Sequence, residues 1–480
     1  MSGIRGVRPA AEWEAVDITA WPVLGPLFRW RHLRSALQLL LLLVALVLVW
    51  DGLTGPQLAP TNLATTVTWL HYRGFVVLAL LAFGNAFCMA CPFMWPRLPL
   101  ERLVRARLVW PRSLRSKWAG VLLLAAFLFA YELFDLWASP RWTAWVIVAY
   151  FAAALTVNGL FRGAPFCKYL CPIGQFNFVG SLISPLEIAV RDHNVCASCT
   201  TKDCFRGREG QRGCELWLFQ EKKYGNMDCT FCLDCIHACP HGNVGIRFRL
   251  PGSELWQDRL RSGVGRLWRR PDVGALVVLF TFGALLNAFG MVSPVYALEA
   301  WLAGLLGTTS EWPVLGLIFV GALVVEPAFL LGGAAWLFRA WSGREEPLIA
   351  VIMRYVYALV PFGMGVWSAH YLFHFLSGFW GVVPVVQNLV VELTGSPWLG
   401  MPRWDLGPAV PVEWLNTLEL GFIALGTWGS LLLAYRLARR DVPQAPWRAF
   451  APWALLIGVL ALVDVWLMLQ PMEMRGTFLA

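Results

Sequence analysis

The sequence predicts a polytopic α-helical membrane protein with one cysteine-rich soluble insertion. Hydrophobic residues make up 58% of the 480 residues and charged residues only 14%, a composition that excludes an ordinary globular protein. Uncharged apolar runs long enough to cross a bilayer recur along the chain. Most of the twelve cysteines fall in a single polar segment near the middle. Together these observations predict two groups of membrane spans on either side of a soluble domain.

Nine apolar stretches are expected to span the membrane, because each reaches about 17 residues or more. They are about 34–50, 74–94, 118–137, 143–161, 273–296, 313–338, 350–379, 415–436 and 449–470. With the N-terminus inside and the C-terminus outside, all but four of the 39 Lys and Arg residues lie on the inner side, as the positive-inside rule requires. The four exceptions are Arg73, Arg141, Arg403 and Arg475. The net charge of +9 therefore reflects topology, and we expect the lipid bilayer, not nucleic acid, as a partner.

The expected location is a prokaryotic cytoplasmic (inner) membrane. The first apolar run begins only after about 33 residues and lacks a small-residue cleavage site, so it is expected to be a span and not a cleaved signal. All twelve cysteines lie on the cytoplasmic side in this topology. Reducing conditions there favour thiolate ligands over disulfides.

The chain divides into a cytoplasmic N-terminal segment and three modules. Residues 1–33 form the segment, and 34–172 form a four-span module with a weak internal repeat. Residues 173–271 form the soluble module, whose tail is expected to lie on the membrane as a surface helix. Residues 272–480 add five spans without cysteine, with an external loop at about 380–414 that is expected to be a docking surface or a lid.

One cysteine motif in the soluble module has a specific meaning. Cys229, Cys232, Cys235 and Cys239 follow the spacing C-x2-C-x2-C-x3-C, and Pro240 comes next. Bacterial ferredoxins hold [4Fe–4S] clusters with this spacing, the fourth cysteine usually binding the neighbouring cluster. A zinc ribbon needs two pairs separated by a longer loop, and a disulfide framework has no reason for such tight intervals. The motif therefore predicts an iron–sulfur cluster.

Four further cysteines precede this motif with the spacing C-x2-C-x4-C-x9-C. This departs from the ferredoxin repeat, since the third interval is longer and Glu215 stands where proline is usual. Because ligands cross over in two-cluster ferredoxins, we expect two [4Fe–4S] clusters in a ferredoxin-like domain. One would be held by Cys214, Cys229, Cys232 and Cys235, and the other by Cys196, Cys199, Cys204 and Cys239. The alternative is one cluster together with a zinc site or free thiols.

The four-span module contains the remaining cysteines in two similar motifs. They are Cys88 and Cys91 followed by Pro92, and Cys167 and Cys171 followed by Pro172. Spacings of three and four place each pair on one helix face, and the prolines end or kink the helix. Two such helix ends at the inner membrane edge predict a four-thiolate site for iron, an iron–sulfur cluster or zinc. The alternative is a set of buried thiols at a helix interface.

These motifs together resemble the NapH/NosR type of membrane-bound polyferredoxin, and a branch sometimes labelled FesM. The specific match covers about 75–250, with weaker similarity around 360–387. The resemblance implies quinol-linked electron transfer through [4Fe–4S] clusters carried by Cys196 to Cys239, and partner redox subunits in a complex. The chain does not carry the flavin-binding domain of NosR-like proteins, and it adds five C-terminal spans that NapH-like proteins do not have.

Ionisable residues inside predicted spans are candidates for quinone or proton chemistry, because they are costly to bury in lipid. The third module contains Glu326, Glu419, Asp464 and the pair His370 and His374. The two histidines lie one turn apart among aromatic residues, which suits a quinol headgroup. Glu326 precedes a proline and is a candidate for a proton path. The alternatives are a haem with His71 as the second ligand, or histidines that only hydrogen-bond neighbouring helices.

The sequence favours the function of a membrane electron-transfer subunit of a quinone-linked oxidoreductase complex. It would pass electrons between the quinone pool and a partner oxidoreductase through the cytoplasmic clusters, in a direction that the motifs do not fix. Two other functions stay open: reduction or assembly of a metal for another metalloenzyme, and a passive iron–sulfur membrane anchor. A phosphate-binding glycine loop and a Rossmann fingerprint are both missing from the sequence.

Overall fold

The computed structural model describes residues 17–96 and 108–471. In these residues, eight helices are long and apolar enough to cross a membrane. They are α2 (Leu33–Thr54), Leu63–Ala82 (α3, Leu63–Thr65; a π-helical turn; α4, Arg73–Ala82), α8 (Pro140–Leu160), α14 (Pro271–Phe289), Glu311–Ser342 (α16, Glu311–Val320; a π-helical turn; α17, Glu326–Ser342), Leu348–Ser377 (α18, Leu348–Tyr355; a 3-10 turn; α19, Val360–Ser377), α21 (Val412–Asp441) and α22 (Pro446–Met468). The predicted class, a polytopic helical membrane protein, is confirmed.

Two of the nine expected spans differ from the prediction. The stretch 118–137 contains a helix of only 16 residues, α7 (Trp118–Leu133), which is about 24 Å long. It ends there because Asp135 adopts a left-handed conformation with φ +42°. The expected span 74–94 begins earlier and ends at Ala82, since Gly84 has φ +88° and breaks the helix before the short α5 (Ala86–Met89).

This shift changes the depth of Arg73. The residue was expected in an outside loop, but it lies near the middle of the helix Leu63–Ala82. Of the other expected outside charges, Arg475 lies beyond the described residues. A half-buried arginine inside a span is a candidate functional group, and its surroundings are described below.

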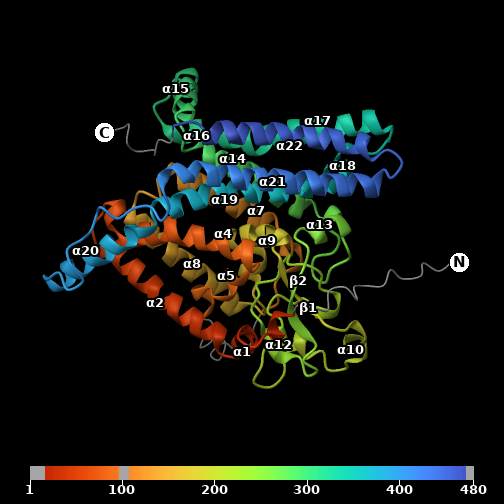
Figure 1. The fold of residues 1–480 in the computed structure, drawn as a ribbon, viewed down its shortest axis with the longest axis horizontal. Coiled ribbons are helices and arrows are strands. Elements are labelled where there is room, and N and C mark those ends of the chain that lie inside the picture. The colour runs from red at the N-terminus through yellow and green to blue at the C-terminus, as the bar shows by residue number, and fades with distance from the viewer. Residues whose placement is uncertain (1–16, 97–107, 472–480) are drawn as a thin grey trace.

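The long helices form a bundle in which α19 packs on α21, α21 on α22, and α22 on α17 (Figure 1). Glycines allow the closest of these approaches. A Cβ on Gly365 of α19 would lie 2.7 Å from the Phe422 carbonyl oxygen, and one on Gly426 of α21 would lie 2.7 Å from the Pro361 oxygen. Small residues commonly permit such contact between membrane helices. The same α19 also packs on α4, so it joins the two groups of spans.

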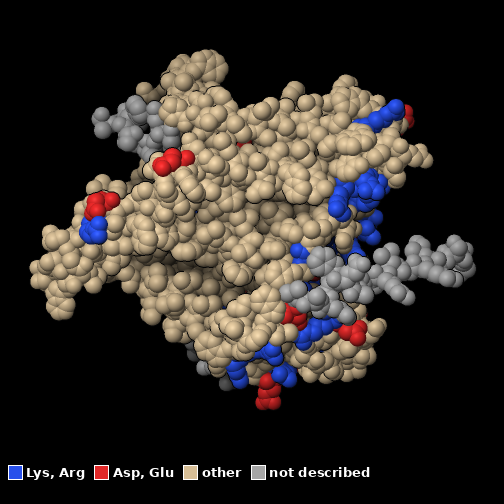
Figure 2. Space-filling view, viewed as in Figure 1, with Lys and Arg blue, Asp and Glu red and all other residues tan. Residues whose placement is uncertain are grey.

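The cysteine-rich module lies at one end of this bundle (Figure 1). Strands β1 (Leu186–Val190) and β2 (Val244–Phe248) pair antiparallel, with Leu186 opposite Phe248. Around them are the short helices α10 (His193–Ser198), α11 (Asp203–Arg206) and α12 (Asp234–Ala238), whereas α9 (Pro172–Gly180) packs on α7 and α14 of the helical part. On the face shown in Figure 2, most charged side chains gather at this end, and the broad middle of the helical part carries almost none. This distribution suits a helical part in lipid and a module in water.

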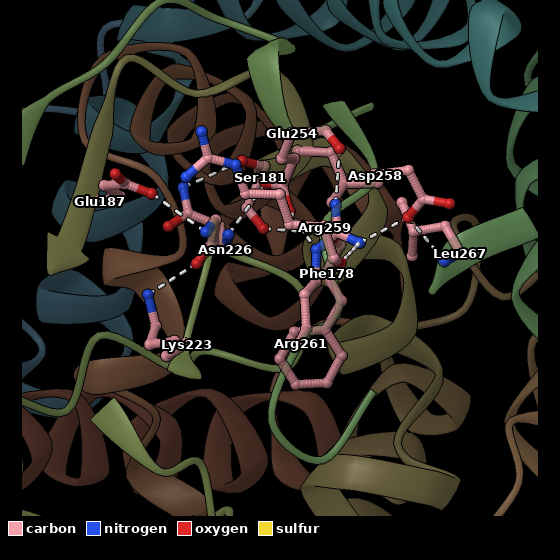
Figure 3. Close-up of polar contacts among 12 residues, drawn as sticks. Phe178, Ser181, Glu187, Lys223, Asn226, Glu254, Asp258, Arg259, Arg261 and Leu267 are labelled. Atoms are coloured by element: carbon pink, nitrogen blue, oxygen red, sulfur yellow. Dashed lines mark hydrogen bonds and ion pairs between the residues drawn. The ribbon is translucent and has the colours of Figure 1, made fainter. Parts of the chain in front are cut away.

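A buried polar network holds the loop that leads to Cys229 (Figure 3). The backbone N–H of Asn226 donates to Glu254 Oε1 at 2.9 Å, and its side-chain amide donates to the Ser181 carbonyl at 3.0 Å. Lys223 donates to the Gly225 carbonyl at 2.6 Å. These hydrogen bonds hold the loop from both its backbone and its side chains.

The expected surface helix at the end of the module is largely replaced by a folded loop. Only α13 (Ser253–Gln257) and a 3-10 turn at Leu267–Arg269 are helical, and α13 ends where Asp258 adopts φ +35°. The Asp258 carboxylate accepts hydrogen bonds from Arg261 and from the Leu267 backbone N–H, both at 2.8 Å (Figure 3). Leu255, Val264 and Leu267 of this stretch are buried against the protein, whereas Leu260 is exposed.

The expected external loop 380–414 contains a helix, α20 (Val382–Thr394). Its Val385 is buried in a cluster with Ala45 and Leu48 of α2 and with Ile147 of α8. Figure 1 places α20 at the end of the molecule away from the soluble module. The segment thus covers the far end of the first group of helices.

Candidate functional site

The cysteines of the soluble module gather in two groups. Cys196, Cys199, Cys204 and Cys239 line one small cavity, and we call them the outer set. Asn243 approaches two of these sulfurs. Its backbone N–H donates to Cys239 Sγ at 3.3 Å, and its side-chain amide lies 3.3 Å from Cys196 Sγ.

The inner set consists of the other four, Cys214, Cys229, Cys232 and Cys235. Cys214 lies close enough to each of the other three for their thiolate charges to interact. Leu218 donates its backbone N–H to Cys214 Sγ at 3.4 Å. The loop that carries Cys229 and Cys232 is tightly wound, since Phe231 and Leu233 have φ +52° and +64°. The structure thus brings the eight cysteines together in the two groups that ligand crossover predicts.

Burial controls the acidity of these thiols. It raises the pKa of Cys204 to about 11 and that of Cys214 to about 12. Cys199 differs from these two: a backbone hydrogen bond from Lys202 is the main reason why its pKa lies below the ordinary value. Without a bound metal, the buried members are therefore neutral thiols, and metal binding would release their protons.

The third group, which we call the membrane-edge set, consists of Cys88, Cys91, Cys167 and Cys171. They line a cavity of about 40 Å³ together with Met94. The two sequence motifs have nearly the same backbone shape, because Cys91 has φ −57° and ψ 117° and Cys171 has φ −58° and ψ 114°. In each case the following proline is the first residue of a helical turn. The repeat seen in the sequence is thus a repeat in structure.

Hydrogen-bond donors point at the sulfurs of the membrane-edge set. The Asn177 amide lies 3.3 Å from Cys88 Sγ, and the Gly174 N–H donates to Cys171 Sγ at 3.2 Å. Burial raises the pKa of Cys88 to about 11 and of Cys171 to about 12. Donors of this kind stabilise thiolates bound to a metal.

The three groups follow one another from the membrane into the module. Cys88 of the membrane-edge set lies close enough to Cys229 of the inner set for their charges to interact. The same holds for Cys235 of the inner set and Cys204 of the outer set. Asn85 bridges the first two groups by donating to the Cys229 carbonyl at 3.1 Å. A route for electrons from sulfur group to sulfur group would therefore run through the module.

The described residues contain no group of three or more His, Cys, Asp or Glu side chains arranged to hold a single metal ion. The cysteine sets differ from such a site in their chemistry. A [4Fe–4S] cluster binds its four thiolates at four different irons, so its ligands surround a cluster and do not converge on one point.

A larger cavity of about 340 Å³ lies between the helices beside the membrane-edge set. Its wall is mostly aromatic and aliphatic and includes Cys91, Tyr150, His71 and Arg73. The Arg73 guanidinium donates to Tyr131 Oη at 3.2 Å. It also lies over the rings of Trp69, Tyr131 and Tyr371 at 4.5–4.9 Å. Sequence reasoning missed this site, although an arginine within an apolar run is its signal.

The histidines predicted for a quinone lie elsewhere. His370 and His374 do touch, with ring centroids 4.9 Å apart, but neither is among the residues that line the large cavity. His374 Nε2 lies 3.3 Å from Met291 Sδ, and His370 Nε2 is buried without a hydrogen-bond partner in the described residues. Their role in quinone chemistry stays a prediction.

The other intramembrane candidates are dispersed. Both ring nitrogens of His71 lie within 3.1 Å of backbone carbonyl oxygens, so neither is free to bind a haem in this arrangement. Glu326 is exposed at the start of α17. Glu419 and Asp464 are buried on the neighbouring helices α21 and α22. The structure therefore does not bring Glu326 together with His370 and His374.

Comparison with known proteins gives weak and partial similarity. No family model matches the chain, and no solved structure matches it. A stretch of 100 residues, 21% of this chain, is 27% identical to "Uncharacterized protein MJ0749" of Methanocaldococcus jannaschii and covers 37% of that protein. A stretch of 88 residues, 18% of this chain, is 30% identical to "Putative electron transport protein YccM" of Escherichia coli and covers 22% of it. The matches thus span about a third and a fifth of these two relatives, and the chain is similar to part of a protein named for electron transport.

Proposed function

We propose that this protein is a membrane electron-transfer subunit that passes electrons between the quinone pool and a partner oxidoreductase. The inner and outer sets would each hold one [4Fe–4S] cluster, and the membrane-edge set would hold a further iron–sulfur cluster. The proposed setting is a prokaryotic cytoplasmic membrane with the soluble module in the cytoplasm. The observation that carries the proposal is the series of three four-cysteine groups that leads from a membrane cavity to the surface. The similarity to a protein named for electron transport supports it.

The residues present fit iron–sulfur clusters. Each of the two module sets offers four cysteine sulfurs, and in each set a backbone N–H donates to one of them, from Leu218 to Cys214 and from Asn243 to Cys239. Such hydrogen bonds and the local charge tune the reduction potential. A bound cluster would supply one-electron chemistry, which lets a two-electron quinol be handled in single steps.

Exposed arginines near the outer set are the proposed contact for the partner. Arg206, Arg208 and Arg212 lie in the stretch between Cys204 and Cys214, and all three are exposed. The stretch is shaped by a turn in which Arg208 and Gln211 pair. A positive surface beside the outermost sulfur group would steer an acidic redox partner into position.

The test is EPR spectroscopy of the anaerobically purified, oxidised full-length protein. Addition of a menaquinol or ubiquinol analogue should produce reduced-cluster signals, or the dithionite-reduced protein should reduce the quinone if electrons run the other way. Protein stripped of iron by a chelator is the control and should give neither result. Clusters that dithionite reduces but that exchange no electrons with either form of the quinone would reject the proposal. They would favour the assembly factor or the passive anchor.

A further inference from the structure

The large membrane cavity is accessible to a lipid-soluble molecule. Val44 of α2 and Phe75 of α4 both line it, and they are 38% and 51% exposed on the apolar flank of the bundle. The rest of the wall is built mainly from aliphatic and aromatic side chains. A ligand that arrives through the bilayer could enter between these helices without crossing water.

Two polar groups stand out in this apolar wall. Arg73 carries a charge inside the span, and the buried Tyr150 hydroxyl has no hydrogen-bond partner among the described residues. The distance between these two polar groups can be judged from α7, because each of them packs on a different residue of that helix. The Tyr150 ring packs on Phe127 at 6.3 Å, and Arg73 lies over Tyr131 at 4.5 Å. Phe127 and Tyr131 are four residues apart, so the two polar groups are offset by about 6 Å along that helix.

This arrangement selects the chemistry of the ligand. The wall suits a flat, uncharged ring, and the two polar groups suit hydrogen-bonding oxygens on opposite sides of it. Cys91 belongs to the same wall, which places such a ring beside the membrane-edge set. A large anionic ligand fits less well, because Arg73 is the one Lys or Arg among the lining residues and three aromatic rings surround it.

We propose that this cavity binds the headgroup of a quinone, with one ring oxygen at Arg73 and the other at the Tyr150 hydroxyl. The proposal rests on the proposed function, and it names a site that differs from the histidine pair expected from sequence. The cavity volume of about 340 Å³ holds a quinone ring, and the exposed flank near Val44 and Phe75 gives the isoprenoid tail a way out.

Equilibrium binding of an oxidised short-chain quinone to the full-length protein in phosphatidylcholine nanodiscs tests this site without electron transfer. Val44→Trp should obstruct the mouth and weaken binding at least tenfold. Val47→Trp is the matched control, since it makes the same change one turn away at a position that is 44% exposed and does not line the cavity. Tyr150→Phe should weaken binding about three- to tenfold, the effect of one lost hydrogen bond. Tyr435→Phe, which changes a tyrosine of α21 that packs on Trp447, should have no effect.

The outcomes separate this proposal from the proposed function. Binding that Val44→Trp and Tyr150→Phe leave unchanged would overturn the cavity site, even if quinol still reduces the clusters. Binding that both variants weaken, with no electron exchange in the EPR test, would keep the site and reject the function. A phospholipid that copurifies with the wild type, is lost in Arg73→Gln and is not displaced by quinone would show that the cavity is a lipid site, which would also overturn the proposal.

Discussion

Replacement of Arg34 should loosen the attachment of the soluble module to the first membrane helix. The guanidinium donates to both carboxylate oxygens of Glu215 at 2.9 and 3.0 Å and to Asp234 Oδ2 at 2.8 Å. The three side chains are only 13%, 4% and 13% exposed. Removing one partner of a buried ion pair costs about 3–5 kcal/mol, because the remaining charge stays buried without compensation. Arg34→Met should therefore raise the population of the open module by about two to four orders of magnitude.

Native-state proteolysis of the detergent-purified protein measures this opening, since cleavage within the module follows the open population when reclosing is fast. The triple variant Arg34→Met, Glu215→Gln, Asp234→Asn should recover most of the loss, because it leaves no uncompensated charge. Arg403→Met is the control and should change nothing, since its ion pair with Asp405 lies on the surface. A change below about fivefold in the single variant, or a triple variant as labile as the single one, would refute the reasoning.

Three further predictions concern the cysteine sets and the loops around them. Cys239→Ser should abolish the EPR signal of one cluster and Cys214→Ser that of the other, each lowering iron by about four atoms per chain; removal of the same signal by both would contradict the crossover. Gly84→Ala should lower the thermal midpoint, because φ is +88° and a Cβ would lie 2.8 Å from a ring carbon of the neighbouring loop. Gly304→Ala, where a Cβ meets nothing within 4 Å, should not lower it. In metal-free protein, Cys199 should be alkylated first as pH rises, with a midpoint below the ordinary 9.0, because its lowered pKa yields thiolate at a pH where the buried cysteines are still protonated; mass spectrometry that finds another cysteine modified first would refute this.

The cysteine groups were within reach of sequence reasoning because their chemistry is local. The intervals from Cys229 to Cys239 fix a tight loop, and knowledge that ligands cross over was enough to assign Cys214 and Cys239 to opposite groups. The pairing of Cys88 and Cys91 with Cys167 and Cys171 also followed from a visible repeat. In each case, the short spacing between cysteines and the four thiolates that a cluster requires limited the possible groupings.

The large cavity was out of reach, because it depends on where helices begin and end and on how they pack. Average hydropathy favoured 74–94 as the second span, since the polar residues before Arg73 lower the score of the true helix. The break after Ala82 depends on the conformation of Gly84, which composition alone does not reveal. Once the helix was misplaced by more than half of its length, Arg73 was assigned to the wrong side of the membrane boundary. Tyr150 had no sequence signal at all.

The crossover of the two module sets determines the order in which the newly made chain can mature. The outer set begins at Cys196 but lacks its last member until Cys239 is synthesised, and the whole inner set lies between them. A ribosome that stops between Cys235 and Cys239 thus releases a chain whose outer set has three cysteines and no fourth ligand, and any thiophilic metal can bind these thiols. The membrane-edge set is complete at Cys171, before any of the soluble module has been made. Under the proposed function, metal loading would have two stages, one during membrane insertion and one after residue 239, when both module sets become complete almost together.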